Sequence, residues 1–293
     1  MEKPKIRVAS VQLALEAPSS ISAYFDRLDH YVRVAAEYEA DFVCFPEHVT
    51  LPLLACESEM VPADAAMEVL TGHTETWKEW LSKSASKHGV NIVGGSHATR
   101  TPDGKIQNVS FFAHRDGKLD AIAKIHPTLD EHAVWGFSGG TDIAPIESDC
   151  GSIGVLICYD SEFPELTRRL VDQSAVGILF VPYMTDTRAG HLRVTYCSHA
   201  RTIENQLYVV TSGFVGNIGN VANLEMAYAQ SAILTPNDHG FARDGIAAQA
   251  EPQIEQMIFA DLDMLALDNA RRRGSVRNLA DRRHDLYRVI WLA

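Results

Sequence analysis

The chain has 293 residues, of which 46% are hydrophobic and 22% charged, and its formal net charge is −12. These values are typical of a globular protein with a sizeable apolar core. The acidic balance argues against a nucleic-acid partner, which needs clustered positive charge. No apolar stretch reaches the roughly 18 residues of a membrane helix, so we expect neither a nucleic-acid nor a membrane partner.

The first residues are charged through Arg7 and then alternate as in a strand, which is unlike a signal peptide. Without an export signal we expect a cytoplasmic protein with reduced cysteines. No two cysteines have C-x-x-C spacing, so neither a zinc site nor a thioredoxin-type disulfide is predicted. The five are Cys44, Cys56, Cys150, Cys158 and Cys197.

Short apolar runs alternate with helical patterns along the whole chain, which predicts an α/β sheet architecture. In the first half we expect strands at 6–12, 41–45 and 91–95, helices at 23–39 and 77–88, and two strands flanking the turn at 115–118. In the second half we expect a strand at 151–158, helices at 162–174 and 191–205, strands at 177–181 and 207–212, a hairpin at 228–242, and a strand at 257–261 before a helix and an arginine-rich tail.

The sequence contains no internal repeat, low-complexity segment or linker. We therefore expect a single domain over residues 1–293. The tail from about residue 265 is expected to pack on the body or on a partner subunit.

The stretch GSIGVLICYDSEFPELTRRL, residues 151–170, ends an apolar strand with Cys158 and then turns into a helix. Pro164 is typical of a first helical turn. A free cysteine is more often a small core residue than a reactive one. Here, however, the positive end of a helix dipole would lower the thiol pKa, and N–H groups at the junction would receive an oxyanion. We therefore expect Cys158 to be alkylated fastest.

Three other ionisable residues lie at the ends of predicted strands, where α/β proteins place their sites. Glu47 follows a strand and Pro46, either as a solvated loop charge or as a carboxylate over the sheet's edge. Lys124 lies in an alternating strand, which favours an exposed position. Glu131 follows in TLDEHAVW and carries no signal by itself. The absence of G-x-S-x-G, H-E-x-x-H and a glycine-rich phosphate loop removes the commoner alternatives.

These segments together resemble the nitrilase, or carbon–nitrogen hydrolase, superfamily, whose catalytic set is Glu, Lys and Cys. FPE resembles the motif of the general-base glutamate, at Glu47, and KIHPT that of the lysine, at Lys124. ICYDSEFPEL resembles the cysteine motif, at Cys158, and the second glutamate falls on Glu131. Supporting segments are DGKIQNVSFFAHRDGKL, ARTIENQLYVV, QSAILTP and LADRRHDLY, so the likeness covers nearly the whole chain.

The resemblance implies a four-layer αββα sandwich and a hydrolase that cleaves a small amide through a cysteine thioester. Glu47 would be the base, Lys124 and the backbone N–H of Tyr159 would hold the oxyanion, and Glu131 would orient Lys124 or the substrate. No metal or organic cofactor is implied. Family members commonly dimerise through helices next to the cysteine, here about 162–174 and 191–205, so we expect at least a homodimer.

The chain departs from the family pattern at three places. Ala123 replaces the arginine that usually precedes the lysine, and His126-Pro127 replaces His-Leu. Cys158-Tyr159-Asp160 replaces the Cys-Trp-Glu of nitrile-cleaving members, which favours an amide over a nitrile.

Substrate residues are expected at Tyr159 and Glu162 and in the loops 182–194 and 215–228, with Asp186 and Arg188 as candidates. Several branches that act on carboxylate-bearing compounds have an arginine four residues after the cysteine. Glu162 occupies this position here, so we expect a neutral or cationic amide unless Glu162 only complements a helix dipole or pairs with an arginine such as Arg188.

Three alternatives remain open. The same fold would serve a nitrilase or an amide-forming acyltransferase. A Cys–His hydrolase would use His126, His191 or His199 as the base. A catalytically silent scaffold would bind partners through the same sandwich, although the intact Glu–Lys–Cys set argues against it.

Overall fold

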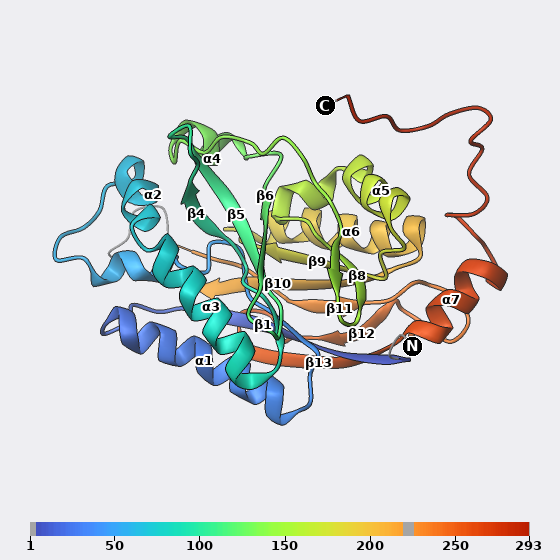
Figure 1. The fold of residues 1–293 in the computed structure, drawn as a ribbon, viewed down its shortest axis with the longest axis horizontal. Helices are drawn as coiled ribbons and strands as arrows, with labels where there is room; N and C mark the ends of the chain where they lie inside the picture. Colours follow the sequence, from blue (N-terminus) through green and yellow to red (C-terminus); the bar gives the residue numbers. More distant parts are fainter. Residues whose placement is uncertain (1–3, 219–225, 293) are drawn as a thin grey trace.

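The computed structural model describes residues 4–218 and 226–292, and it confirms the predicted α/β class. Helices α1 (Ile21–Glu37) and α3 (Thr74–His88) cover one outer face, and α5 (Pro164–Gln173) and α6 (Arg188–Asn205) cover the other. The strands lie between these two pairs of helices (Figure 1).

The main strand order is β4-β5-β3-β2-β1-β10-β9-β8-β7, with β6 on β5, β13 on β1, and β11 and β12 continuing from β10. The two halves join where β1 and β10 pair at Leu13–Leu15 and Phe214–Gly216. The strand bounds are β1 Lys5–Leu15, β2 Phe42–Cys44, β3 Asn91–Val93, β4 His97–Arg100, β5 Ile106–Ala113, β6 Leu119–Ala123, β7 Ile146–Ser148, β8 Gly151–Val155, β9 Ile178–Tyr183, β10 Tyr208–Gly216, β11 Ala232–Leu234, β12 Ile246–Gln249 and β13 Gln256–Asp263.

The period of two along β1 explains the layers, because successive side chains of a strand point to opposite faces. Val8 belongs to the apolar cluster that also contains strands of the other half, whereas Ala9 and Val11 belong to the cluster with α1 and α3. Phe42 of β2 and Phe180 of β9 have ring centroids 5.4 Å apart. The two halves therefore pack face to face, as in the expected αββα sandwich.

Most predicted elements are confirmed within a few residues, but two need correction. The hairpin predicted at 228–242 is wrong, because β11 pairs with β12 at Ile246–Gln249 across a longer loop. The strand before Cys158 ends at Val155, and Cys158 opens a 3₁₀ helix, η2, at Cys158–Glu162. Short elements that periodicity did not predict are β4, β7, α2 (Ala63–Thr71), α4 (Leu129–Ala133) and the 3₁₀ helix η1 (Leu51–Cys56).

The C-terminal segment follows α7 (Met264–Arg273) and contacts the body at α5. Arg282 pairs with Asp172 at 2.6 Å, and the guanidinium of Arg169 lies 4.3 Å from the ring centroid of Trp291.

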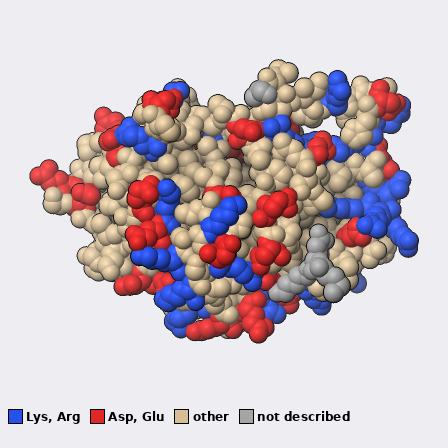
Figure 2. Space-filling view, in the orientation of Figure 1, with Lys and Arg blue, Asp and Glu red and all other residues tan. Residues whose placement is uncertain are grey.

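Acidic and basic side chains are interspersed on the face shown in Figure 2. Among the described residues, no helix has the length and apolar character needed to cross a membrane.

Candidate active site

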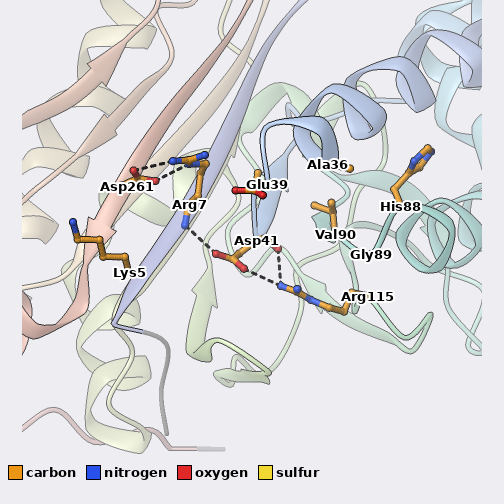
Figure 3. A pocket seen from close by; sticks show the side chains of 11 residues that line it. Lys5, Arg7, Ala36, Glu39, Asp41, His88, Gly89, Val90, Arg115 and Asp261 are labelled. Carbon is orange, nitrogen blue, oxygen red and sulfur yellow. Dashed lines mark hydrogen bonds and ion pairs between the residues drawn. The ribbon is translucent and has the colours of Figure 1, made fainter.

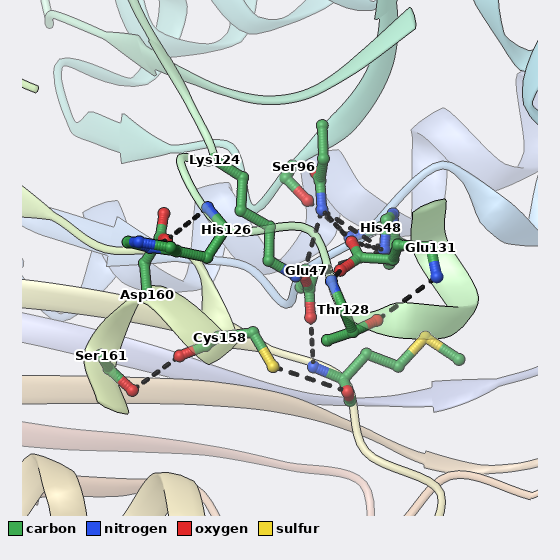
Figure 4. A network of polar contacts seen from close by, with 12 residues as sticks. Glu47, His48, Ser96, Lys124, His126, Thr128, Glu131, Cys158, Asp160 and Ser161 are labelled. Atoms are coloured by element: carbon green, nitrogen blue, oxygen red, sulfur yellow. Dashed lines mark hydrogen bonds and ion pairs between the residues drawn. The ribbon is translucent and has the colours of Figure 1, made fainter. Parts of the chain in front are cut away.

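Three segments that are distant in sequence bring Glu47, Lys124, Glu131 and Cys158 together in one cluster (Figure 4). Glu47 follows β2, Lys124 follows β6 directly, and Cys158 follows β8 at the start of η2. Glu131 lies in α4, a short helix that begins with a capping box between Thr128 and Glu131. The structure thus places together the four residues that the resemblance implied.

Lys124 is buried, with a side chain only 1% exposed, so the exposed position favoured by the alternating pattern is wrong. Its Nζ donates to Glu47 Oε1 at 2.7 Å and to Glu131 Oε2 at 2.5 Å. Burial alone would lower the pKa of Lys124, but the two carboxylates outweigh it and raise the pKa above its usual value. Lys124 is therefore a permanent ammonium ion, and an ammonium has a third N–H to offer.

Glu131 has donors at both of its carboxylate oxygens. Oε1 accepts from Asn108 Nδ2 at 2.9 Å and lies 3.3 Å from His48 Nε2. Oε2 accepts from Lys124 Nζ at 2.5 Å and from the backbone N–H of Thr128 at 2.8 Å. Burial alone would raise the pKa of Glu131, but Lys124 and then His48 lower it well below its usual range. Glu131 is therefore an ionised counterion.

Glu47 accepts three hydrogen bonds. Its Oε1 accepts from Lys124 at 2.7 Å and from Asn108 at 3.0 Å, and its Oε2 accepts from the backbone N–H of Met184 at 2.9 Å. The side chain is 2% exposed. Each carboxylate oxygen has two lone pairs, so Oε2 retains acceptor capacity beside Met184.

Cys158 is joined to Glu47 through the backbone of Met184. The thiol lies 3.7 Å from the Met184 carbonyl oxygen, while the N–H of the same residue holds Glu47. Cys158 has a φ of +49°, which is a sparsely populated conformation for a residue with a side chain. Such strain, maintained by the fold, fixes the direction of the thiol.

The expected lowering of the thiol pKa is wrong. Burial and then the negative charge of Glu47 raise the pKa of Cys158 well above its ordinary value, and Lys124 offsets this only in part. The physical reason is the burial of the thiol inside η2, whereas α5 begins later, at Pro164. The thiol is neutral in this state, so it needs a base to become a nucleophile.

Asp160 holds the cysteine and lysine segments together. Its Oδ2 accepts from the backbone N–H of Ile125 at 2.9 Å, and its Oδ1 accepts from the backbone N–H of His126 at 2.9 Å and faces His126 Nδ1 at 2.8 Å. The His126 ring also stacks on Phe163, with centroids 3.7 Å apart. These contacts give the unusual His126-Pro127 sequence a structural role.

Sequence reasoning gave no role to His48, Asn108, Met184 or Asp160. Two signals were present: His48 directly follows the glutamate motif, and Asn108 is a polar residue in the apolar strand segment NVSFF. Met184 acts through its backbone, for which residue type gives no signal.

The cluster contains atoms of the type that bind metal ions. Glu47, His48 and Glu131 each offer one such atom, and these atoms lie within 4.8 Å of one another. The Lys124 ammonium already pairs with both carboxylates. The chain itself thus supplies the positive charge that these carboxylates need, and the absence of a metal from the chemistry stays a prediction.

The remaining predicted substrate residues lie farther out. Tyr159 is partly buried and packs edge-on against Phe163, with centroids 4.9 Å apart. Asp186 and Arg188 are exposed around the start of α6, and among described residues no hydrogen bond joins them to Glu47, Lys124, Glu131 or Cys158. Of the loop 215–228, residues 219–225 lie outside the described residues.

Glu162 is 18% exposed and lies 3.7 Å from Arg193 rather than pairing with Arg188. Burial raises the pKa of Glu162, and Arg193 and then Lys124 counteract the shift.

Two of the three histidines considered as alternative bases, His126 and His191, have other partners. His126 contacts Asp160, and His191 Nδ1 lies 3.2 Å from the hydroxyl of Tyr183. Burial lowers the pKa of His191 to about 4. Among the described residues, no hydrogen bond or ion pair joins Cys158 to a histidine, which weakens the Cys–His alternative.

A second hollow, of about 560 Å³, lies near the amino-terminal ends of β1 and β2 (Figure 3). Both of its arginines are paired, Arg7 with Asp261 at 2.7 Å and Arg115 with Asp41 at 3.3 Å. Glu47, Lys124, Glu131 and Cys158 are not among its lining residues. This hollow is therefore separate from the four-residue cluster.

Comparison with known proteins agrees with this geometry. The carbon–nitrogen hydrolase family model matches residues 7–272. The chain is 40% identical to the probable hydrolase YhcX of Bacillus subtilis over 97% of this chain, but it spans only 55% of that protein's length. It is 30% identical to the 2-oxoglutaramate amidase of the same organism over 72% of this chain and 75% of that protein.

The omega-amidase NIT3 of Saccharomyces cerevisiae is 28% identical over 97% of this chain and 95% of its own length. The crystal structure of yeast Nit3, described as a member of branch 10 of the nitrilase superfamily, superposes with a TM-score of 0.78. That structural match covers 96% of this chain and 98% of the other, at 25% identity.

Proposed function

The chain belongs to the carbon–nitrogen hydrolase family as an amidase-type member, and we propose that it hydrolyses a small amide through a thioester on Cys158. The observation that carries the proposal is the environment of two carboxylates around one ammonium. Glu131 is fully engaged as a counterion, whereas Glu47 lies beside the residue that contacts the thiol. This arrangement supplies a nucleophile, a base and a cation within one cluster.

In the acylation half, Glu47 takes the thiol proton and the sulfur attacks the carbonyl carbon, forming the S–C bond. The carbonyl π electrons move to oxygen, giving a tetrahedral oxyanion. The third N–H of Lys124 and the backbone N–H of Tyr159 donate to this oxygen. Protonated Glu47 then gives its proton to the leaving nitrogen as the C–N bond breaks, which releases ammonia or an amine.

In the deacylation half, Glu47 takes a proton from water and the resulting oxygen nucleophile attacks the thioester carbon. The same donors hold the second oxyanion. As the C–S bond breaks, the sulfur receives the proton from Glu47, and the acid leaves. The thiol proton leaves with the nitrogen and a proton from water replaces it on sulfur, so Glu47, Lys124 and Cys158 return to their starting states without a cofactor.

We also propose that the enzyme is cytoplasmic and acts as a homodimer or a larger homo-oligomer. The exposed apolar residues Tyr196 and Ile203 on α6, 66% and 41% exposed, support an interface at this helix. The molecular mass in solution tests the dimer directly. The single domain over 1–293 stays a prediction.

The test of the function combines turnover with trapping. We expect wild type to release ammonia from at least one of butyramide, 4-aminobutyramide and succinamate, and Cys158→Ala to abolish the release. In Glu47→Gln, intact-protein mass spectrometry is expected to show an acyl adduct on Cys158 with an activated substrate such as a thioester. Full turnover by Cys158→Ala would contradict the proposal.

The same panel separates the alternatives. A nitrile substrate giving an acid would indicate a nitrilase, and a new amide formed from an added amine would indicate an acyltransferase. Failure of Cys158 to be acylated by any probe would favour the silent scaffold.

A further inference from the structure

We propose that His48 is a positioning residue that holds Glu131 as the unprotonated counterion of Lys124 and thereby leaves Glu47 as the base of the pair. This inference rests on the proposed function. It assigns a reason why two chemically identical side chains in one cluster take different roles.

The donors to the two glutamates are nearly matched among the residues that the structure describes. Each carboxylate accepts from Lys124 Nζ and from Asn108 Nδ2. Each also accepts one backbone N–H, from Met184 at Glu47 and from Thr128 at Glu131, at 2.9 and 2.8 Å. Three donors on one side therefore balance three on the other.

His48 is the donor that breaks this balance. Its Nε2 lies 3.3 Å from Glu131 Oε1 but 3.8 Å from Glu47 Oε1, which is beyond hydrogen-bond range. Asn108 Nδ2 also lies 3.4 Å from His48 Nε2, but its two N–H groups are directed to Glu47 Oε1 and Glu131 Oε1. We therefore assign the ring proton to Nε2, because a lone pair there would face two carboxylates. The extra donor stabilises the ionised form of Glu131 more than that of Glu47.

The fold fixes the His48 ring in this position. His48 has a φ of +54°, and its backbone N–H donates to Ser96 Oγ at 2.9 Å. The ring stacks on Phe137, with centroids 5.6 Å apart, and meets Trp135 edge-on at 5.1 Å. A buried ring held by aromatic contacts on two sides loses little further freedom when it donates to Glu131.

The charged and titratable groups around His48 and Glu131 are few. Glu47 and Lys124 belong to the cluster, Cys158 acts on it from η2, and His97 interacts with His48 from β4. Burial lowers the pKa of His97 to about 3. Its two nitrogens contact the hydroxyls of Thr50 and Thr74 at 2.7 and 2.9 Å, so His97 is a neutral structural residue.

The experiment compares His48→Asn with the matched control His97→Asn in the full chain. Asparagine tolerates a positive φ, and its amide ends well short of the histidine Nε2, so His48→Asn removes the donor while retaining the backbone. The readout is the pH profile of kcat and kcat/KM, measured as ammonia release from whichever panel amide wild type turns over.

For His48→Asn we expect the acid limb of kcat/KM to move about one pH unit higher, because the proton is then shared between two more equal carboxylates. We expect kcat to fall about tenfold with little change in KM. His48→Gln restores an N–H donor, so the acid limb of its kcat/KM profile should lie close to that of wild type. His97→Asn should lower the melting temperature and leave the limb in place.

An unchanged acid limb in His48→Asn, or an equal shift in His97→Asn, would overturn the proposal. If His48→Asn does not fold, His48→Gly replaces it, because glycine also accepts the positive φ and lacks the donor. A raised acid limb in His48→Gly supports the donor role, and an unchanged limb contradicts it. If wild type releases no ammonia from any panel amide in a Cys158-dependent manner, the proposed function is overturned instead.

Discussion

Strand β2 has a buried acidic residue at each end, and the two ends differ in the cation that each residue meets. Before the strand, Asp41, with a side chain 5% exposed, pairs at 3.3 Å with Arg115, whose side chain is 33% exposed. After the strand, Glu47 pairs at 2.7 Å with Lys124, and both side chains are at most 2% exposed. The two buried carboxylates thus have partners that differ in their access to water.

This difference decides how each charge is stabilised. An ion pair whose cation reaches water is screened by the solvent, so the loss of that cation is partly compensated by water. A pair with both partners buried must offset a large desolvation cost with further hydrogen bonds, which Asn108 and Glu131 supply here. The Lys124 ammonium is therefore stabilised by the surrounding protein groups, whereas water also stabilises the Arg115 guanidinium.

Removing the cation at each end should give the largest contrast. Lys124→Met should lower kcat/KM by about 10²–10³-fold, because an oxyanion donor normally contributes about 2.7–4 kcal/mol to the barrier. It should also destabilise the fold by about 3–5 kcal/mol, since two buried carboxylates lose their partner. Steady-state kinetics and urea unfolding measure both effects.

Arg115→Met at the other end of β2 is the matched control. It should change turnover less than twofold and destabilise the fold less than Lys124→Met does, because Asp41 keeps the backbone N–H of Arg7 and the Arg115 side is open to water. Equal losses of turnover and stability in Lys124→Met and Arg115→Met would show that burial of the cation does not distinguish the two ends.

The cysteines extend the same comparison. Cys158 lies at the Lys124 end of β2. Cys150 lies at the Arg115 end, where its thiol accepts a hydrogen bond from Arg115, and burial raises its pKa to about 12. Because burial also raises the pKa of Cys158, we now expect iodoacetamide at neutral pH to label the partly exposed Cys56 and Cys197 first. This reverses the expectation of fastest labelling at Cys158.

Raising the pH should speed the labelling of every cysteine, because the thiolate is the reactive form. Peptide mapping over time gives the order. Preferential labelling of Cys158 at neutral pH would contradict the neutral thiol. Its acylation by an activated substrate should still be selective, since the substrate binds beside Glu47.

The smallest expected effect concerns Glu162, which lies between the two extremes at 18% exposed and 3.7 Å from Arg193. If its carboxylate repels acidic substrates, butyramide and 4-aminobutyramide should be preferred over succinamate by a few-fold. Glu162→Gln should narrow this preference, and Arg193→Gln should widen it.

A preference for succinamate that persists in Glu162→Gln would show that Glu162 does not set substrate charge.

The sequence predicted the α/β class and the long elements because their periodicity reflects burial on one face or one stripe. The motifs of the family predicted Glu47, Lys124, Glu131 and Cys158 as one cluster. Periodicity failed for Lys124, since an alternating pattern cannot tell a solvent-facing lysine from one neutralised by carboxylates distant in sequence. It also failed for the thiol pKa, which depends on burial and on Glu47 rather than on the nearby helix.

Asp160 gives the two loops of the cluster a common local stability. Its carboxylate accepts two backbone N–H groups from the segment after Lys124, while its own backbone N–H donates to Ile157 at 3.0 Å within the cysteine segment. Local opening of either segment must break the shared bonds, so the amides of Ile125, His126 and Asp160 should exchange with solvent deuterium as one cooperative unit. Lys124 and Cys158 then leave and regain their positions in the cluster together when this region opens and closes.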